Sequence, residues 1–181
     1  SESIPGVEFK NAEGSATSVA VVAGALGDAR PPAPPPESWA ADRDNDVAIF
    51  TIRMEPGAEL VLPAASEGCN RTLYYFRGTG LTIGGSRFEN HCGMRLQSDA
   101  DIEIVNGTAE AELLLLQGRP IGEPVAHYGP FVMNSSQEIE QAIVDYRRTE
   151  YGGWPWKEDG PVHQRDEGRF ALHADGTLER P

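Results

Sequence analysis

Short runs in which apolar and polar residues alternate recur from about residue 17 to residue 117, and they constrain the fold more than any other feature. The run 46–54 places Phe50, Ile52 and Met54 on one face, because side chains two positions apart point to the same side of a strand. Further runs cover 58–63, 72–77, 80–85, 101–105 and 109–117, and turn residues lie between them at Pro56-Gly57, Gly84-Gly85 and Asn106-Gly107. Short, regularly spaced strands of this kind predict an antiparallel β-barrel or sandwich.

One segment inside this series lacks the strand pattern. Residues 30–46, with the sequence RPPAPPPESWAADRDND, are first proline-rich and then charged. Prolines at this density favour an extended, solvated backbone and provide few donors for a sheet. The segment is therefore predicted to be a surface loop inserted between two strands.

A helix is predicted after the strands. Ser135 and Glu138 have the spacing of a capping box, in which the first side chain caps the helix and the second reaches back to it. We expect a helix over 136–149 that packs on the barrel, followed by an irregular tail over 154–181. The apolar stripe that this helix is predicted to bury consists of Ile139, Ala142, Ile143 and Tyr146.

Composition excludes several classes of function. The net charge is −13, whereas nucleic-acid binding needs a concentration of lysine and arginine, and an acidic chain does not favour anionic membrane surfaces. The longest apolar run, LLLL at 113–116, is far shorter than a membrane-spanning helix. The chain has two cysteines, no CxxC pair and no apolar signal segment at its first residues, which predicts reduced thiols in a cytoplasmic protein.

Residues 55–80, EPGAELVLPAASEGCNRTLYYFRGTG, draw attention as a candidate site. A turn, an alternating run, a polar loop, an aromatic run and glycines follow one another. This order predicts two adjacent strands whose connecting loop lies at the mouth of the barrel, where ligand sites gather. The loop nevertheless contains no pair of histidines or carboxylates.

The glycine spacing around this loop resembles the two sequence motifs of cupins, a family of jelly-roll barrels whose motifs supply three histidines and a glutamate to a metal. In this chain the four ligand positions fall on Pro63, Ala65, Arg71 and Leu96. Proline, alanine and leucine offer no side-chain ligand atom, and an arginine repels a cation. We therefore expect no metal in this chain and a barrel filled by packed side chains.

A more specific resemblance lies downstream. The run GRPIGEPVAHYGPFVMN at 118–134, followed by the capped helix, resembles the C-terminal region of pirin-family proteins. Pirins resemble two cupin barrels in tandem, with iron held in the N-terminal barrel. The resemblance covers the C-terminal half only, and it implies an all-β cupin (jelly-roll) barrel at 1–133, with 30–46 as an inserted loop, a C-terminal helix at 134–153 packed on the barrel and the tail at 154–181.

The function implied by this resemblance is that of a non-catalytic, metal-free C-terminal cupin domain without a cofactor of its own. It would support an upstream metal-bearing cupin or contact a partner protein, while quercetin-type dioxygenase chemistry or transcriptional co-regulation would belong to the complete protein. We expect the chain to be a fragment, because SESIPGVEF lies where a pirin second barrel starts. The isolated barrel is expected to self-associate through an apolar patch that contains Val19, Val21 and the aromatic residues of 72–76.

An alternative is a small-molecule enzyme, dioxygenase-type or hydrolytic, with a pocket at the barrel mouth. Its residues would be Arg71, His91, Cys92 and Cys69, where Arg71 would hold a carboxylate and Cys92 would supply a nucleophile. A second alternative is a zinc site in the tail, where His163 and His173 lie near Asp166 and Asp175. His127 is interpreted as a hydrogen-bonded structural residue.

Overall fold

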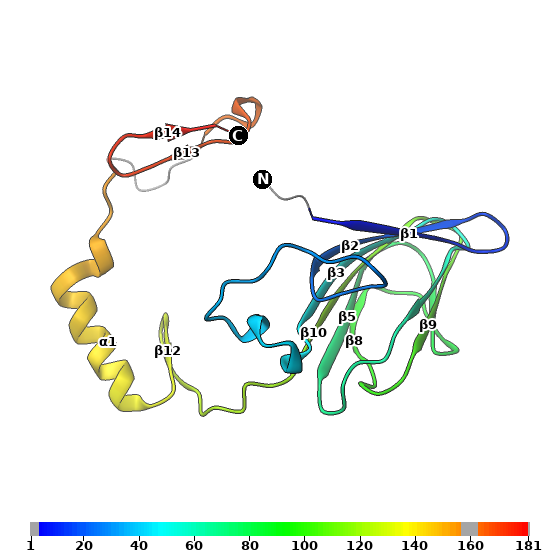
Figure 1. The fold of residues 1–181 in the computed structure, drawn as a ribbon, viewed down its shortest axis with the longest axis horizontal. Helices are drawn as coiled ribbons and strands as arrows, with labels where there is room; N and C mark the ends of the chain where they lie inside the picture. The colour runs from blue at the N-terminus through cyan, green and yellow to red at the C-terminus, as the bar shows by residue number, and fades with distance from the viewer. Residues whose placement is uncertain (1–3, 157–162, 181) are drawn as a thin grey trace. The chain divides into compact units, whose positions relative to one another are not determined.

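The computed structural model describes residues 4–156 and 163–180, and the chain divides into two compact units, residues 1–122 and 123–181. The first unit contains two antiparallel β-sheets, and the second contains a hairpin, a helix and a short C-terminal hairpin (Figure 1). Among the described residues no helix is both long and apolar enough to cross a lipid bilayer.

The larger sheet of the first unit has six strands. In spatial order they are β1 (Gly6–Lys10), β2 (Ala16–Ala23), β3 (Ala48–Met54), β10 (Ala111–Gly118), β5 (Asn70–Arg77) and β8 (Cys92–Arg95). The smaller sheet has four, in the order β4 (Glu59–Leu62), β9 (Ile102–Asn106), β6 (Leu81–Ile83) and β7 (Ser86–Phe88). The alternating runs predicted strands at β2 to β6, β9 and β10, whereas β1, β7 and β8 lacked a clear pattern.

The two sheets enclose one apolar core, as the alternation predicts. Ile52 of β3 and Leu113 of β10 are fully buried in the larger sheet, and Leu62 of β4 is fully buried in the smaller one. Val19 and Val21 also belong to this core, at 1% and 0% exposure. The prediction that they form an exposed patch is therefore wrong, because they occupy the inward positions of β2.

The outer face of the larger sheet carries exposed apolar side chains instead. Tyr74 and Phe76 of β5 are 42% and 48% exposed, while Tyr75 between them is buried. Val22 of β2 and Leu116 of β10 are exposed as well. The aromatic part of the predicted patch is thus present on the surface.

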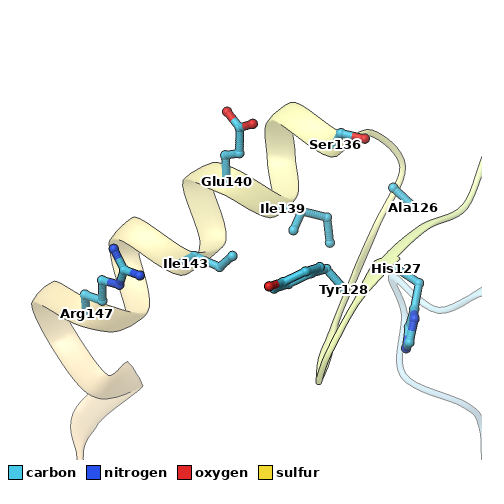
Figure 2. A pocket seen from close by; sticks show the side chains of 8 residues that line it. All are labelled: Ala126, His127, Tyr128, Ser136, Ile139, Glu140, Ile143 and Arg147. Atoms are coloured by element: carbon cyan, nitrogen blue, oxygen red, sulfur yellow. The ribbon is translucent and has the colours of Figure 1, made fainter.

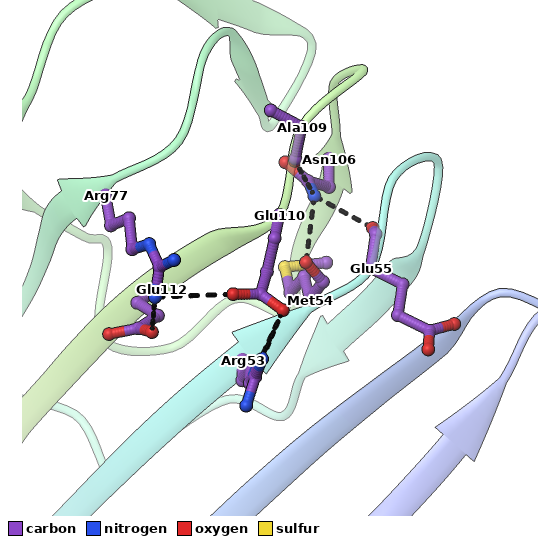
Figure 3. A network of polar contacts seen from close by, with 8 residues as sticks. All are labelled: Arg53, Met54, Glu55, Arg77, Asn106, Ala109, Glu110 and Glu112. Carbon is purple, nitrogen blue, oxygen red and sulfur yellow. Dashed lines mark hydrogen bonds and ion pairs between the residues drawn. The ribbon is translucent and has the colours of Figure 1, made fainter.

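At one end of the larger sheet an ion-pair network joins Arg53, Arg77, Glu110 and Glu112 (Figure 3).

The turn signals do not all connect paired strands. β4 and β5 lie in different sheets, so residues 55–80 are not a hairpin. The Asn106-Gly107 turn likewise carries the chain from β9 in the smaller sheet to β10 in the larger one. Gly107 is required there, since a Cβ atom would lie 2.5 Å from the carbonyl oxygens of Thr79 and Gly80. Residues 30–46 form the expected loop, with short 3-10 turns at Trp39–Ala41 and Arg43–Asn45.

The second unit is built around α1 (Ser136–Thr149), which confirms the predicted helix. The helix contacts a hairpin of β11 (Ala126–Tyr128) and β12 (Phe131–Met133), and this hairpin groups with the helix in the second unit. The 3-10 turn Glu150–Gly152 follows the helix, and a further turn at Arg165–Glu167 precedes β13 (Ala171–Leu172) and β14 (Leu178–Glu179). That α1 packs on the barrel stays a prediction.

The predicted apolar stripe of α1 is only partly buried. Ile139 and Ala142 are buried and Ile143 is half-buried, but Tyr146 is 47% exposed. Its ring instead packs edge-on against Phe131 and Tyr151. The last position of the predicted face thus contacts the hairpin and the turn after the helix with its ring, and about half of its surface remains in solvent.

Removal of the helix cap should weaken α1 measurably. The Ser135 Oγ accepts a hydrogen bond from the Glu138 backbone N–H at 3.3 Å and donates one to the Glu138 carboxylate at 2.9 Å. We expect Ser135→Ala to cost about 1 kcal/mol in the stability of this unit, because a helical N–H loses its partner. Urea unfolding followed by circular dichroism at 222 nm would measure the loss. The matched control is Ser136→Ala, and an equal loss in both variants would contradict the role of the cap.

Candidate functional site

The four positions that correspond to cupin metal ligands do gather at one end of the barrel. Pro63 directly follows β4, Arg71 is the second residue of β5, and Leu96 directly follows β8. The Leu96 backbone N–H donates to the Arg71 carbonyl at 3.0 Å, and the Ala65 N–H donates to the Ser98 carbonyl at 2.7 Å. The segments that carry these four positions are therefore joined by backbone hydrogen bonds, although the side chains are not those of a metal site.

Arg71 occupies the centre of this end of the barrel. Its side chain is buried, at 2% exposure, and its guanidinium donates to four backbone carbonyls. Nη2 donates to the Pro63 carbonyl at 2.8 Å, and Nη1 lies within 3.1 to 3.4 Å of three acceptors, the carbonyls of Gln97, Ser98 and Ala100. The arginine thereby ties the residue after β4 to the loop between β8 and β9.

Burial and two nearby carboxylates shift the pKa of Arg71 in opposite directions. Burial lowers the pKa of its guanidinium below the ordinary value, although the negative charges of Asp46 and Asp101 oppose that shift. Its Nε is buried and has no hydrogen-bond partner among the described residues. Buried donors are nearly always paired, so this atom marks a place where the protein leaves a hydrogen bond unused.

The residues at this end do not fit a metal ion. A first-row metal needs three or four histidine, cysteine or carboxylate ligands around one point, and over residues 4–156 and 163–180 no group of three such side chains could hold one. The guanidinium of Arg71 instead places a positive charge where the ligand glutamate of a cupin is expected. The donor set is thus one that repels a cation.

Asp46 lies next to Arg71 and is held by its own set of donors. Its Oδ2 accepts from the Ser66 backbone N–H at 2.7 Å and from the Cys69 thiol at 3.8 Å, while Oδ1 accepts from the Gln117 amide at 3.1 Å. Burial raises the pKa of Asp46, but these hydrogen bonds outweigh it and bring the pKa below its ordinary value. Burial raises the pKa of Cys69, and the charge of Asp46 raises it further. Cys69 is thus a poor nucleophile.

A small cavity of about 120 Å³ opens beside these groups. Its polar lining consists of Arg71, Asp46 and Gln117, and its apolar wall includes Phe50 and Leu62. The sequence indicated Arg71, but Asp46 and Gln117 were missed. Asp46 ends the proline-rich loop in a left-handed conformation, at φ 49°, and nothing in its sequence neighbourhood points to a position beside β5.

The structure does not bring His91 and Cys92 to this cavity. Cys92 pairs with Tyr75 in the register of β8 on β5, four residues along the strand from Arg71, which is a separation of roughly 13 Å. The predicted pocket that combines Arg71 and Cys69 with His91 and Cys92 is therefore not formed. His91 instead packs edge-on against Tyr75, with Nε2 3.3 Å from the Gly78 carbonyl oxygen, and both cysteines are free thiols.

The other histidines do not form a site either. In the described part of the tail, His163 packs against Phe170, and His173 lies 3.5 Å from Glu179. These contacts are separate, and they do not assemble the predicted zinc ligands. His127 lies on β11, paired with Val132 of β12, and its side chain is exposed. That it is a hydrogen-bonded structural residue stays a prediction.

The second unit has a groove of its own, of about 460 Å³, between α1 and the β11–β12 hairpin. Figure 2 shows the Tyr128 ring facing Ile139 and Ile143, whereas Glu140 points away from it. Arg147 lines the end of the groove that lies farther along the helix. The groove is largely apolar and carries no cluster of reactive groups.

Comparison with known proteins shows to which family this chain belongs. A family model described as the pirin C-terminal cupin domain matches residues 49–152, which is more than half of the chain. This chain belongs to the pirin family. The matched range begins in β3 and runs through α1, so both units carry features of the pirin domain.

Relatives and solved structures agree with this placement. A Pseudomonas aeruginosa protein provisionally named quercetin 2,3-dioxygenase is 35% identical over 107 residues, which cover 58% of this chain and 36% of that protein. Human pirin is 31% identical over 105 residues, covering 56% of this chain and 36% of pirin. A crystal structure of quercetin 2,3-dioxygenase from Acinetobacter baumannii superposes with a TM-score of 0.65 and 25% identity, over 83% of this chain and 48% of that one. The chain thus spans about a third of these curated pirin relatives.

Proposed function

We propose that this chain is the metal-free, non-catalytic cupin domain of a pirin-like protein, and that it supports a metal-bearing cupin or contacts a partner protein. The observation that carries the proposal is the buried guanidinium of Arg71, which donates to the Pro63, Gln97, Ser98 and Ala100 carbonyls at the end of the barrel where the cupin ligands are expected. A fixed positive charge excludes a second cation from the same place, because the two would repel each other in a poorly solvated interior.

The activity of a complete pirin-like protein is part of the same proposal. The names of the bacterial relatives favour quercetin-type dioxygenase chemistry, and the iron that this reaction needs would be held by another cupin domain. In this chain the cavity beside Arg71, at about 120 Å³, is too small for a flavonol, since drug-sized ligands occupy pockets of roughly 300 Å³ or more.

The partner of this domain is proposed to be the upstream cupin half, or a second copy of the chain where that half is missing. Support comes from the exposed apolar side chains on the outer face of the larger sheet, namely Tyr74, Phe76, Leu116 and Val22. The net charge of −13 opposes contacts with nucleic acid or anionic membranes. The enzyme alternative around Arg71, His91 and Cys92 is not retained, because Cys92 pairs with Tyr75, four residues along β5 from Arg71.

Metal content and flavonol turnover test the proposal together. After exposure to Fe(II) and Zn(II) and removal of loosely bound ions, we expect far less than one metal per chain by elemental analysis. We also expect no oxygen-dependent loss of quercetin by absorbance in the presence of added iron. His163→Gln and His173→Gln variants serve as controls that identify metal held by the tail. One metal per chain that survives both substitutions, or quercetin turnover by this chain, would contradict the proposal.

A further inference from the structure

We propose that the proline-rich part of the inserted loop, residues 31–35, docks a protein domain whose groove is lined by tryptophan and tyrosine and bordered by positive charge. This inference goes beyond the proposed function, because it concerns other residues than the exposed sheet face and holds whether or not that face is covered. It depends on three features: the backbone conformation that the prolines impose, the anchoring of both ends of the loop, and the acceptors and charges that the segment presents.

The prolines determine the backbone conformation of this segment. Each residue from 31 to 35 is a proline or directly precedes one. A proline ring fixes φ near about −65°, and the residue before a proline is pushed out of the helical region into extended conformations. The segment is accordingly neither helix nor strand, as a polyproline II conformation requires. Because polyproline II has roughly three residues per turn, Pro31 and Pro34 lie along one edge, and Pro32 and Pro35 lie along the next.

Both ends of the loop are fixed to the barrel. Before the prolines, the Leu26 side chain is buried in the core, and after them Asn45 is buried as well. The Asn45 carbonyl accepts from the Arg119 backbone N–H at 2.7 Å, and the Trp39 indole N–H donates to the Arg119 carbonyl at 2.9 Å. Between these anchors, residues 32–36 are all exposed. A segment that is already extended and held at both ends loses little conformational entropy when a partner binds it.

The segment presents hydrogen-bond acceptors and few donors, because proline has no backbone N–H. Among the described residues, nothing donates a hydrogen bond to the carbonyls of residues 31–34. The Pro35 carbonyl accepts from the Ser38 N–H at 3.0 Å and from its Oγ at 2.7 Å, which turns the chain after the prolines. Tryptophan and tyrosine combine an apolar ring with an N–H or O–H donor. A groove lined by them can therefore pack on both proline edges and donate to these carbonyls, which is how such grooves bind polyproline II segments.

The charges beside the segment determine the sign of the partner's border. Glu37 directly follows the last proline and is exposed, and residues 37–46 contain four carboxylates and one arginine. On the other side, the Arg30 guanidinium donates to the carbonyls of Gly27 and Ala29 at 2.7 and 2.9 Å. The carboxylates would repel a groove with an acidic border and attract one with a basic border, because complementary charges select the partner.

An SH3 domain is a suitable probe, in its natural form with acidic residues beside the aromatic groove and in a form with lysines in their place. The ¹⁵N-labelled domain is titrated with the full chain and followed by NMR. We expect chemical-shift changes confined to the groove, and binding at least about threefold tighter for the lysine form, as a single exposed charge pair provides. Glu37→Lys should reverse this preference. No shifts in either form at about 1 mM chain, or the same preference in Glu37→Lys, would overturn the inference.

Two double variants locate the binding on the chain. Pro32→Ala with Pro35→Ala removes one proline edge and releases the backbone, so it should weaken binding to the lysine form by at least about tenfold. Pro120→Ala with Pro124→Ala is the matched control, because it removes two exposed prolines from the connection between β10 and β11 and should leave binding unchanged. The four prolines are exposed, so thermal unfolding should confirm that both double variants remain folded. Equal binding by the two double variants would show that residues 31–35 are not the docking segment.

Discussion

Replacement of Arg71 by methionine is expected to lower the free energy of unfolding of the barrel by about 3–5 kcal/mol, which is large for a single substitution. Methionine preserves much of the buried apolar volume but donates no hydrogen bond. The carbonyls of Pro63, Gln97, Ser98 and Ala100 would then lose their common donor in a partly buried setting, and each unsatisfied acceptor is unfavourable. Urea unfolding curves of the parent and the variant measure the difference directly.

Two further substitutions test whether the loss of stability comes from the hydrogen bonds of the Arg71 guanidinium. Arg95→Met removes an exposed arginine from the neighbouring strand β8 and should change stability by no more than about 0.5 kcal/mol. Arg71→Lys keeps the positive charge but loses the planar fork, so its stability should lie between those of the parent and Arg71→Met. If Arg71→Met were as stable as the parent, the four carbonyl contacts would contribute nothing, and the role assigned to this arginine would be wrong.

The second large effect is expected for Asn106→Asp at the crossing between the two sheets. The Asn106 side chain is 5% exposed, and its Nδ2 donates to the carbonyls of Met54, Glu55 and Ala109 at 3.1, 2.8 and 2.8 Å (Figure 3). Aspartate would put a negatively charged oxygen against three carbonyl oxygens. We expect a loss of about 3–5 kcal/mol at pH 7, because a buried charge would be left without a donor on that side.

The loss should depend on pH in a definite direction. Burial among carbonyl oxygens disfavours the charged form, so the pKa of the introduced carboxyl group should be higher in the folded state than in the unfolded chain. The folded variant then binds more protons than the unfolded variant, and its stability relative to the parent should rise as the pH falls from 7 toward 5. Unfolding curves at both pH values test this. Asn70→Asp, at an exposed position of β5, is the matched control and should show neither effect.

The elements and the family of this chain follow from local sequence patterns. Alternation of apolar and polar residues predicted most of the strands. In a two-layer β-structure every second residue of a strand faces the core, whichever strand it pairs with. The capping box marked the start of α1, since its hydrogen bonds join residues three positions apart. The sequence also predicted that Pro63, Ala65, Arg71 and Leu96 provide no metal ligand, because this depends only on residue identity.

Only the tertiary structure decided which strands pair and which side chains meet. Pro-Gly and Asn-Gly turns are compatible with a hairpin or with a crossing between sheets, and the choice depends on distant strands that compete for the same edge. Three of the carbonyls that Arg71 contacts lie 26 to 29 positions away in sequence, and Asp46 reaches its neighbourhood from the end of another loop. Contacts between residues this far apart in sequence leave no local periodicity, so they cannot be predicted from a sequence pattern. The sequence by itself determined that position 71 provides no metal ligand. Only the tertiary structure decided that a buried guanidinium lies there and binds the surrounding carbonyls.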